Sequence, residues 1–358
     1  MKKVFNFSAG PAILPTEVFE QTADACRSFS KSGLSILEMS HRSKEIIAVM
    51  DEAIALVKEL LGVPQGYQVL FLQGGASLQF SMVPYNLLPQ TGKAVYIDTG
   101  VWAKKASKEA KLFGDVVVAA SSSDKNYNYL PGIPQNLPAD AVYCHVTSNN
   151  TIFGTQMSHF PKISLPYVAD MSSDIFSRPI DVSQFGLIYA GAQKNLACAG
   201  TTLVIVREDL LGKAGRTIPS MLDYKIHIEG ESMFNTPPVI SIYVSLLTLR
   251  WLKKTGGLVA LEQHNKAKAG KLYDAIDNSK LFTGTANKAD RSLMNVTFVT
   301  QTPELEEAFL ALAKERGLDG LKGHRSVGGF RASIYNAMPM EGIDALVSAL
   351  QDFDRAHA

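Results

Sequence analysis

The sequence has few cysteines, no long apolar run and almost no net charge. Three of its 358 residues are cysteines, and no CxxC pair occurs, which excludes a disulfide framework and favours reduced thiols. No apolar run approaches the roughly 18 residues of a membrane span. The first apolar segment is interrupted by Asn6, Gly10 and Pro11, which argues against a signal peptide. We therefore expect a soluble, cytoplasmic protein that does not enter a membrane.

The charge balance and the composition narrow the class of protein further. Thirty-five Lys+Arg and 34 Asp+Glu give a net charge of +1, so no bulk attraction to nucleic acid or to a membrane surface is expected. An acidic small molecule would need a local cluster of basic residues. The chain is 46% hydrophobic and 19% charged, which is typical of a globular protein. A prior of about 150 residues per domain suggests two domains.

The first two thirds of the chain alternate between short apolar strands and helical segments. Helices are predicted over 17–29 and 44–61, and strands over 67–72, 93–98, 115–120, 140–146, 167–172, 185–190 and 201–206. Near-continuous apolar strands separated by helices predict an α/β fold, with a parallel or mixed sheet covered on both faces. The last two strands have no room for a full helix between them, so we expect that pair to be antiparallel or a broken unit.

The pattern changes toward the C-terminus. Long helical segments over 238–277 are followed by a strand at 292–299, a helix at 303–317, a strand at 329–337 and a final helix. That helix places Ile343, Leu346, Val347, Leu350 and Phe353 on one face. We therefore predict a large domain over 16–260 and a smaller α+β domain formed by 1–15 and 261–358.

Three features of the large domain could carry chemistry. The QGGAS turn (73–77) follows a strand and opens a helix, where backbone N–H groups can hold an anion, although it can also be a plain tight turn. Asp170 ends a buried strand, where α/β sheets place ligand contacts, but it could equally cap a helix. Lys194 lies between two apolar strands, and an ion-paired or snorkelling lysine is the alternative to a reactive one. Together, the three can hold pyridoxal phosphate, with the lysine as an imine and the acid beside the pyridinium nitrogen.

Longer segments resemble a known family. These are FNFSAGPA (5–12), SHRS (40–43), SSDIFSRPIDVSQFGLIYAGAQKN (172–195), MFNTPP (233–238) and GHRSVGGFRASIYNAMP (323–339). In this order, and over nearly the whole chain, they resemble the phosphoserine aminotransferases, which are class V, fold-type-I enzymes that depend on pyridoxal phosphate. The resemblance implies a homodimer with its active sites at the subunit interface.

The resemblance also implies roles for particular residues. Lys194 forms the imine with the cofactor and moves a proton, and Asp170 contacts the pyridine nitrogen. Trp102 stacks on the ring. The matching positions for further cofactor contacts are Ala76, Ser77, Thr151 and Gln193, with Asn235 and Thr236 supplied by the partner subunit.

Two anionic groups are expected on the substrate. By the resemblance, Arg331 binds the α-carboxylate, whereas the phosphate is surrounded by His324 and Arg325 and by His41 and Arg42 of the other subunit. Arginine suits both anions because its planar fork makes paired, charge-assisted hydrogen bonds. Some relatives have an arginine at the position of Ser77 and a serine at that of Ala9, and the loss of that arginine would weaken phosphate binding unless another basic residue compensates.

The expected activity is amino-group exchange between L-glutamate and 3-phosphohydroxypyruvate, with 3-hydroxy-2-oxo-4-phosphooxybutanoate of vitamin B6 synthesis as a second implied substrate. One rival hypothesis is another class V enzyme, such as an alanine–glyoxylate aminotransferase, which needs no second anion site, or a cysteine desulfurase, which needs a reactive cysteine. The other is a Rossmann nucleotide-binding protein, but a GxGxxG motif is missing after the first strand, and Lys194 would then have no role.

Overall fold

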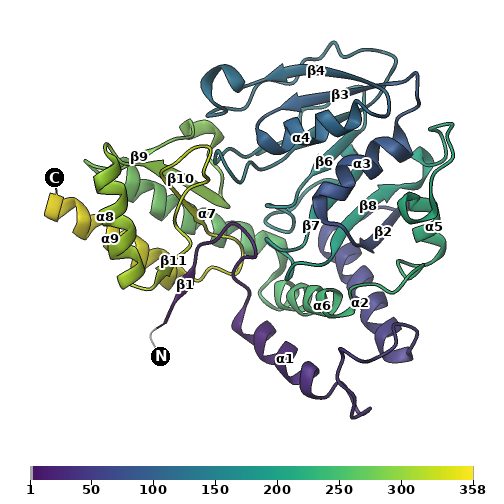
Figure 1. The fold of residues 1–358 in the computed structure, drawn as a ribbon, viewed down its shortest axis with the longest axis horizontal. Helices are drawn as coiled ribbons and strands as arrows, with labels where there is room; N and C mark the ends of the chain where they lie inside the picture. The colour runs from purple at the N-terminus through teal and green to yellow at the C-terminus, as the bar shows by residue number, and fades with distance from the viewer. Residues whose placement is uncertain (1–2, 358) are drawn as a thin grey trace.

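The computed structural model describes residues 3–357. The larger of its two parts is built around a seven-stranded mixed sheet, with the strand order β2-β8-β7-β6-β5-β3-β4 (Figure 1). The strands are β2 (Tyr67–Leu72), β3 (Lys93–Asp98), β4 (Asp115–Ser121), β5 (Ala141–Thr147), β6 (Tyr167–Asp170), β7 (Phe185–Gly191) and β8 (Thr202–Arg207). All seven coincide with predicted strands, within three residues at either end.

Most of this sheet is parallel. Strands β7, β6, β5, β3 and β4 run in one direction, whereas β8 is antiparallel to both β7 and β2. The prediction of an antiparallel pair is therefore confirmed. Because β5, β6 and β7 are parallel neighbours, their carboxyl ends at Thr147, Asp170 and Gly191 meet at one edge of the sheet. Ligand contacts in open α/β sheets occur at this edge.

Helices cover both faces of the large sheet. They are α1 (Thr16–Arg27), α2 (Lys44–Leu61), α3 (Gly75–Leu87), α4 (Val101–Ala110), α5 (Tyr224–Glu229) and α6 (Val239–Lys254). Side chains of β2 alternate between two apolar cores: Phe71 packs in the core that includes α2 and α6, and Leu70 packs in the core that includes α3 and α4. The strands are apolar throughout because each face of the sheet meets helices.

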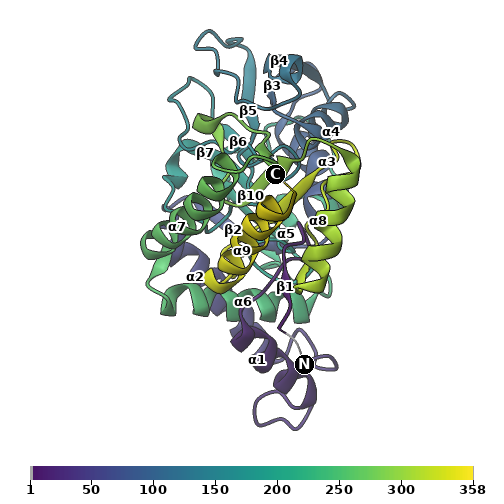
Figure 2. The same cartoon turned by 90° about the vertical axis from the view of Figure 1, so that its left-hand side faces the viewer.

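The smaller part has its own short sheet, in which β10 (Asn295–Val299) lies between β9 (Thr283–Gly284) and β12 (Phe330–Ser333). Helices α8 (Pro303–Glu315) and α9 (Met340–His357) pack beside it (Figure 2). The apolar face predicted for the last helix is confirmed, because its five residues are all buried in this core. The chain start joins the same part: β1 (Phe5–Asn6) pairs in parallel with β11 (Leu318–Asp319), and Phe7 is fully buried there.

One helix runs through both parts. Helix α7 (Gly257–Asp277) places Leu258 and Leu261 in a core of the large part and Leu272 and Ile276 in the core of the small part. The predicted boundary near residue 260 falls inside this helix, so the division at that residue stays a prediction. Among residues 3–357, no helix is long and apolar enough to cross a membrane.

Candidate active site

Lys194 lies in the turn between β7 and β8, at the edge where the strands β5, β6 and β7 end. Its Nζ donates a hydrogen bond to the Thr151 hydroxyl oxygen at 2.6 Å and lies 5.8 Å from the centroid of the Trp102 ring. Burial lowers the pKa of Lys194 to about 8; the negative charge of Asp170 opposes this fall, and the positive charge of Arg331 reinforces it. A lysine with such a pKa is partly uncharged near neutral pH, as a nucleophilic amine must be.

Asp170 is the last residue of β6, and its side chain is buried beside this lysine. The Ser172 backbone N–H and hydroxyl both donate to Asp170 Oδ1, at 3.0 and 2.7 Å. The Ser172 oxygen in turn accepts from the Gly191 N–H at 3.0 Å. Burial raises the pKa of Asp170, and the charge of Lys194 and the bonds from Ser172 act against that rise. Both of these hydrogen bonds use Oδ1, so Oδ2 can accept one from a ligand.

Trp102 lies in the first turn of α4, and its indole Nε1 is buried without a hydrogen-bond partner among the described residues. The preceding turn must approach the loop after β5 closely. A Cβ built on Gly100, which has φ +151°, would lie 2.8 Å from Asn150 Oδ1. Glycine at this position therefore lets the loop that carries Thr151 approach Trp102.

The QGGAS turn opens α3 as predicted, with Gly74 at φ 86° directly before the helix. Ala76 and Ser77 lie in the first turn, where backbone N–H groups lack partners within the helix and favour an anion. Asn235 and Thr236 approach the same turn of their own chain, since Gln73 Nε2 donates to the Thr236 carbonyl oxygen at 3.1 Å.

The N-terminal segment covers the lysine turn from the side of the smaller part. The Gln193 carbonyl accepts from the Ala12 N–H at 3.0 Å, and the Ala9 carbonyl accepts from the Tyr335 hydroxyl at 2.8 Å. A Cβ on Gly10 would lie 3.4 Å from Lys194 Cγ. Segments from the two ends of the sequence thus enclose Gln193 and Lys194.

Basic side chains of the smaller part reach the same place. Arg331 Nη1 donates to the Thr151 carbonyl at 3.4 Å, while its Nε is buried without a partner among residues 3–357. Burial lowers the pKa of His324, and the charges of Arg331, Arg325 and Lys105 lower it further. Three cationic side chains, Arg331, Arg325 and Lys105, therefore surround the His324 imidazole beside the lysine site.

His41 and Arg42 are not brought to this site within one chain. They directly precede Ser43, the cap of α2, and the segment between α1 and α2 lies at the lower edge of Figure 1, apart from the smaller part. Arg42 is exposed, and His41 Nε2 is buried without a partner in the described part of the chain.

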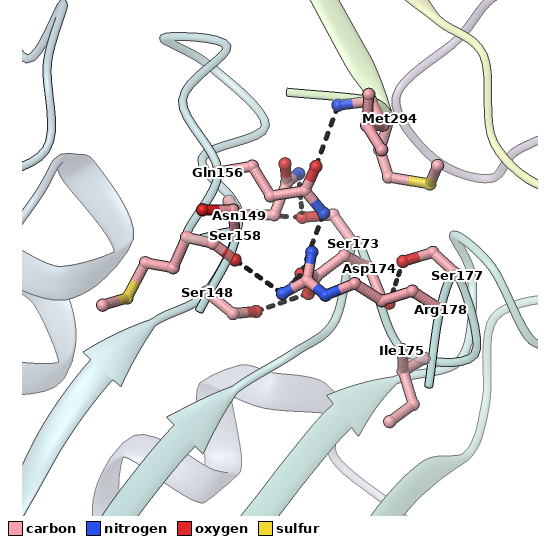
Figure 3. A network of polar contacts seen from close by, with 12 residues as sticks. Ser148, Asn149, Gln156, Ser158, Ser173, Asp174, Ile175, Ser177, Arg178 and Met294 are labelled. Atoms are coloured by element: carbon pink, nitrogen blue, oxygen red, sulfur yellow. Dashed lines mark hydrogen bonds and ion pairs between the residues drawn. The ribbon is translucent and has the colours of Figure 1, made fainter. Parts of the chain in front are cut away.

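Several supporting residues were missed in the sequence. A buried carboxylate, Asp174, accepts hydrogen bonds from Ser148 and, at 3.1 Å, from Gln156 Nε2 (Figure 3). Arg178 lies 3.7 Å from Asp174 and donates to the Met157 carbonyl at 2.5 Å. This network joins the loop after β5, which carries Thr151, to the segment after β6. Asp174 and Arg178 occur in the SSDIFSR motif, but their roles depend on a loop some twenty residues earlier in the chain.

Comparisons with known proteins agree with this geometry. A family model described as Aminotransferase class-V matches residues 4–346. The phosphoserine aminotransferase of Flavobacterium johnsoniae is 61% identical over 352 residues, which cover 98% of each chain. The structure of phosphoserine aminotransferase from Bacillus circulans subsp. alkalophilus superposes with a TM-score of 0.96 at 49% identity, covering 99% of each chain. The structure of PLP-bound phosphoserine aminotransferase from Trichomonas vaginalis superposes with a TM-score of 0.91 at 38% identity. The match covers 98% of this chain and 100% of the Trichomonas chain.

These matches exclude the Rossmann alternative, and they extend over both parts of the molecule and over the lysine turn that joins β7 to β8. The chain belongs to the phosphoserine aminotransferases of aminotransferase class V.

Proposed function

We propose that this enzyme exchanges the amino group between L-glutamate and 3-phosphohydroxypyruvate, giving 2-oxoglutarate and O-phospho-L-serine, with pyridoxal phosphate as its cofactor. The observation that carries the proposal is the pair of half-buried Lys194, in the turn after β7, and buried Asp170, at the end of the adjacent strand β6, with the lysine pKa lowered to about 8. The relatives' names and the basic cluster beside this pair support the choice of substrates.

The residues present fit pyridoxal phosphate. Asp170 Oδ2 is available to a protonated ring nitrogen, the unpartnered Trp102 adjoins Lys194, and the first turn of α3 suits a phosphate. In this reading, Ala76, Ser77, Thr151 and Gln193 hold the cofactor from one subunit. Asn235 and Thr236 lie beside this turn of their own chain, where Gln73 donates to the Thr236 carbonyl; by the family resemblance, they would complete the phosphate site of the partner subunit.

Lys194 performs the chemical steps that this chain supplies. When bound, the cofactor takes up the amino group reversibly and delocalises the electron pair left when the Cα–H bond breaks. Lys194 Nζ, partly uncharged near neutral pH, would hold the cofactor through its carbonyl carbon until the substrate amine displaces it. The freed amine would then take the proton from the substrate Cα and deliver it to that carbon of the cofactor. The Asp170 carboxylate would hold the protonated ring nitrogen and keep it protonated. The hydrogen bond to Thr151 orients Nζ.

The two halves of the reaction use the same anion sites in turn. Arg331 receives the α-carboxylate, which both substrates have. The far end of the substrate is a phosphate in one half-reaction and the side-chain carboxylate of glutamate in the other. His324 and Arg325, with His41 and Arg42 of a second subunit, surround that end, so the enzyme runs by a ping-pong mechanism.

The resemblance to the family, together with the position of the segment that carries His41 and Arg42, supports a homodimer. The segment between α1 and α2, which carries His41 and Arg42, lies apart from the smaller part within one chain, so these two residues would serve the site across a subunit interface. The substrate 3-hydroxy-2-oxo-4-phosphooxybutanoate has the same keto acid and phosphate groups, and we propose that it is accepted too. Burial raises the pKa of the Cys144 thiol to about 12, so Cys144 is unsuited to supply the reactive thiolate that a cysteine desulfurase needs.

The decisive experiment is an absorbance titration of the purified protein. A band near roughly 400 nm is expected from the imine of a Schiff-base lysine, and Lys194→Ala should lack or alter it. Glutamate should bleach the band, and 3-phosphohydroxypyruvate should restore it, whereas pyruvate and glyoxylate should not. A protein that cannot be reconstituted with pyridoxal phosphate would refute the proposal. Recovery with glyoxylate alone would favour an alanine–glyoxylate aminotransferase.

A further inference from the structure

The face of α4 that adjoins the site carries a lysine with no role so far. Lys105 Nζ lies 4.7 Å from the centroid of the Trp102 ring, and the two residues share a helix face because they are three positions apart. Among residues 3–357, Lys105 forms no ion pair with an acidic residue. Its charge reaches His324, whose pKa it lowers together with Arg331 and Arg325.

The adjacent lysine points elsewhere. Lys104 Nζ lies 5.2 Å from the Tyr127 ring centroid, and the hydrogen bond to Tyr127 raises its pKa, assisted by the charge of Asp98. The α-helix turns by about 100° per residue, which explains why two exposed neighbours of equal charge face different partners. Lys104 thus has a carboxylate nearby, whereas Lys105 faces other cations.

The loop that carries His324 is held against this helix. Val327 packs in a small apolar cluster with Val101 and Trp102 of the first turn of α4. The Gly328 N–H donates to the His324 carbonyl at 2.9 Å, which keeps the loop compact. Lys105 and the 323–328 loop therefore approach each other from different parts of the molecule, through a contact that involves no charge.

Cations gathered without acidic neighbours repel one another. Arg331, Arg325 and Lys105 act together on the His324 imidazole, and no carboxylate contributes to the shift of its pKa. Such a group becomes favourable once an anion binds between its members, and the gain grows with the charge of the anion. A phosphate ester has about −1.5 to −2 charges near pH 7, against −1 for a carboxylate.

We propose that Lys105 belongs to the subsite for the far anion of the substrate and favours its phosphate over the side-chain carboxylate of glutamate. This inference rests on the proposed function and adds a residue that sets specificity within it. Lys105 takes no part in proton transfer.

The test compares Lys105→Met with Lys104→Met, which removes the same charge one residue away. Each half-reaction is followed in the holoenzyme, with O-phospho-L-serine or L-glutamate as amino donor. For Lys105→Met, we expect KM for O-phospho-L-serine to rise roughly tenfold, as for the loss of one charge-assisted contact. KM for glutamate should rise no more than about twofold, as for an exposed, screened charge. The kcat of both half-reactions should equal that of the wild type. Lys104→Met should have the wild-type KM for both donors, and Lys105→Arg, which keeps the positive charge, should also keep the wild-type KM for O-phospho-L-serine.

Three outcomes would overturn the inference. Lys105→Met could raise KM equally for both donors, or Lys105→Met and Lys104→Met could raise KM for O-phospho-L-serine equally. The third is a changed cofactor absorbance spectrum in Lys105→Met, which would mean that Lys105 acts through Trp102. If the wild type does not use O-phospho-L-serine, the proposed function fails separately. Titration of the holoenzymes with inorganic phosphate still tests Lys105 in that case, since its loss should weaken phosphate binding and that of Lys104 should not.

Discussion

At the scale of single residues, the charge of Lys194 and the charge of Asp170 each shift the pKa of the other side chain. Burial lowers the pKa of Lys194 from 10.5 to about 8, and the charge of Asp170 limits that fall. The uncharged amine predominates above its pKa, so the rate at which cofactor-free enzyme captures pyridoxal phosphate should rise with pH to a midpoint near 8. Asp170→Asn removes the opposing charge and should move the midpoint to lower pH. Stopped-flow absorbance measures both, and a midpoint near 10 in either protein would contradict the assignment.

Ser172 is predicted to position Asp170. Its hydroxyl lowers the pKa of Asp170 and satisfies the buried N–H of Gly191. Ser172→Ala should therefore raise the pH at which activity is lost on the acid side. It should also lower the free energy of unfolding by about 2 kcal/mol, because a buried donor loses its acceptor.

The matched control is Ser173→Ala, which removes a buried hydrogen bond to the Asn149 carbonyl at 3.0 Å and leaves Asp170 untouched. In urea unfolding, Ser173→Ala should lose about as much free energy of unfolding as Ser172→Ala. Its activity should keep the wild-type dependence on pH. If both variants shift the profile equally, Ser172 has no special effect on the carboxylate.

At the scale of elements, α7 joins the two parts through a buried lysine. Lys268 Nζ donates to the carbonyls of Ile334 and Tyr335, at 3.0 and 2.7 Å, directly after β12. Tyr335 in turn holds Ala9 over the lysine turn. The helix thus positions the segment that follows Arg331.

Lys268→Met should lower the free energy of unfolding by about 3 kcal/mol, because it leaves buried carbonyls without donors. Lys266→Met on the same helix breaks an exposed ion pair with Glu262. It should change the free energy of unfolding by less than about 0.5 kcal/mol. Chemical denaturation of the cofactor-free forms compares the two. Equal values would mean that the carbonyls find other partners.

At the scale of the whole molecule, the proposed site needs two chains. In a mixture of Lys194→Ala and Arg42→Ala subunits, refolded together, a hybrid dimer has one site with Lys194 from one subunit and Arg42 from the other. Activity should recover to roughly a quarter of the wild-type value in a statistical mixture, although each variant alone is nearly inactive. Separate refolding before mixing is the control. No recovery after joint refolding would place Arg42 in the site of its own chain.

Much of the fold could be predicted from local sequence. The strands of the large sheet are short apolar runs because helices cover both faces, and their bounds agree within three residues. The antiparallel pair β7–β8 follows from a connection too short for a crossover helix. Helix α2 ends at Leu61 because Gly62 adopts φ 59°. Periodicity also identified the buried face of α9. It did not show that α7 spans two cores, since a helical repeat does not say what each turn packs against.

Some features of the candidate site could likewise be predicted from the sequence, and others could not. By itself, the sequence determined that Lys194 lies between two buried strands and that Asp170 ends a third, because both facts depend on neighbours along the chain. Only the tertiary structure decided that Ser172 links Asp170 to Gly191, that Asp174 ties two loops together, and that Lys105 faces His324. Those contacts join segments that are distant in sequence or depend on the direction of a side chain, and only the packing of the two parts sets them.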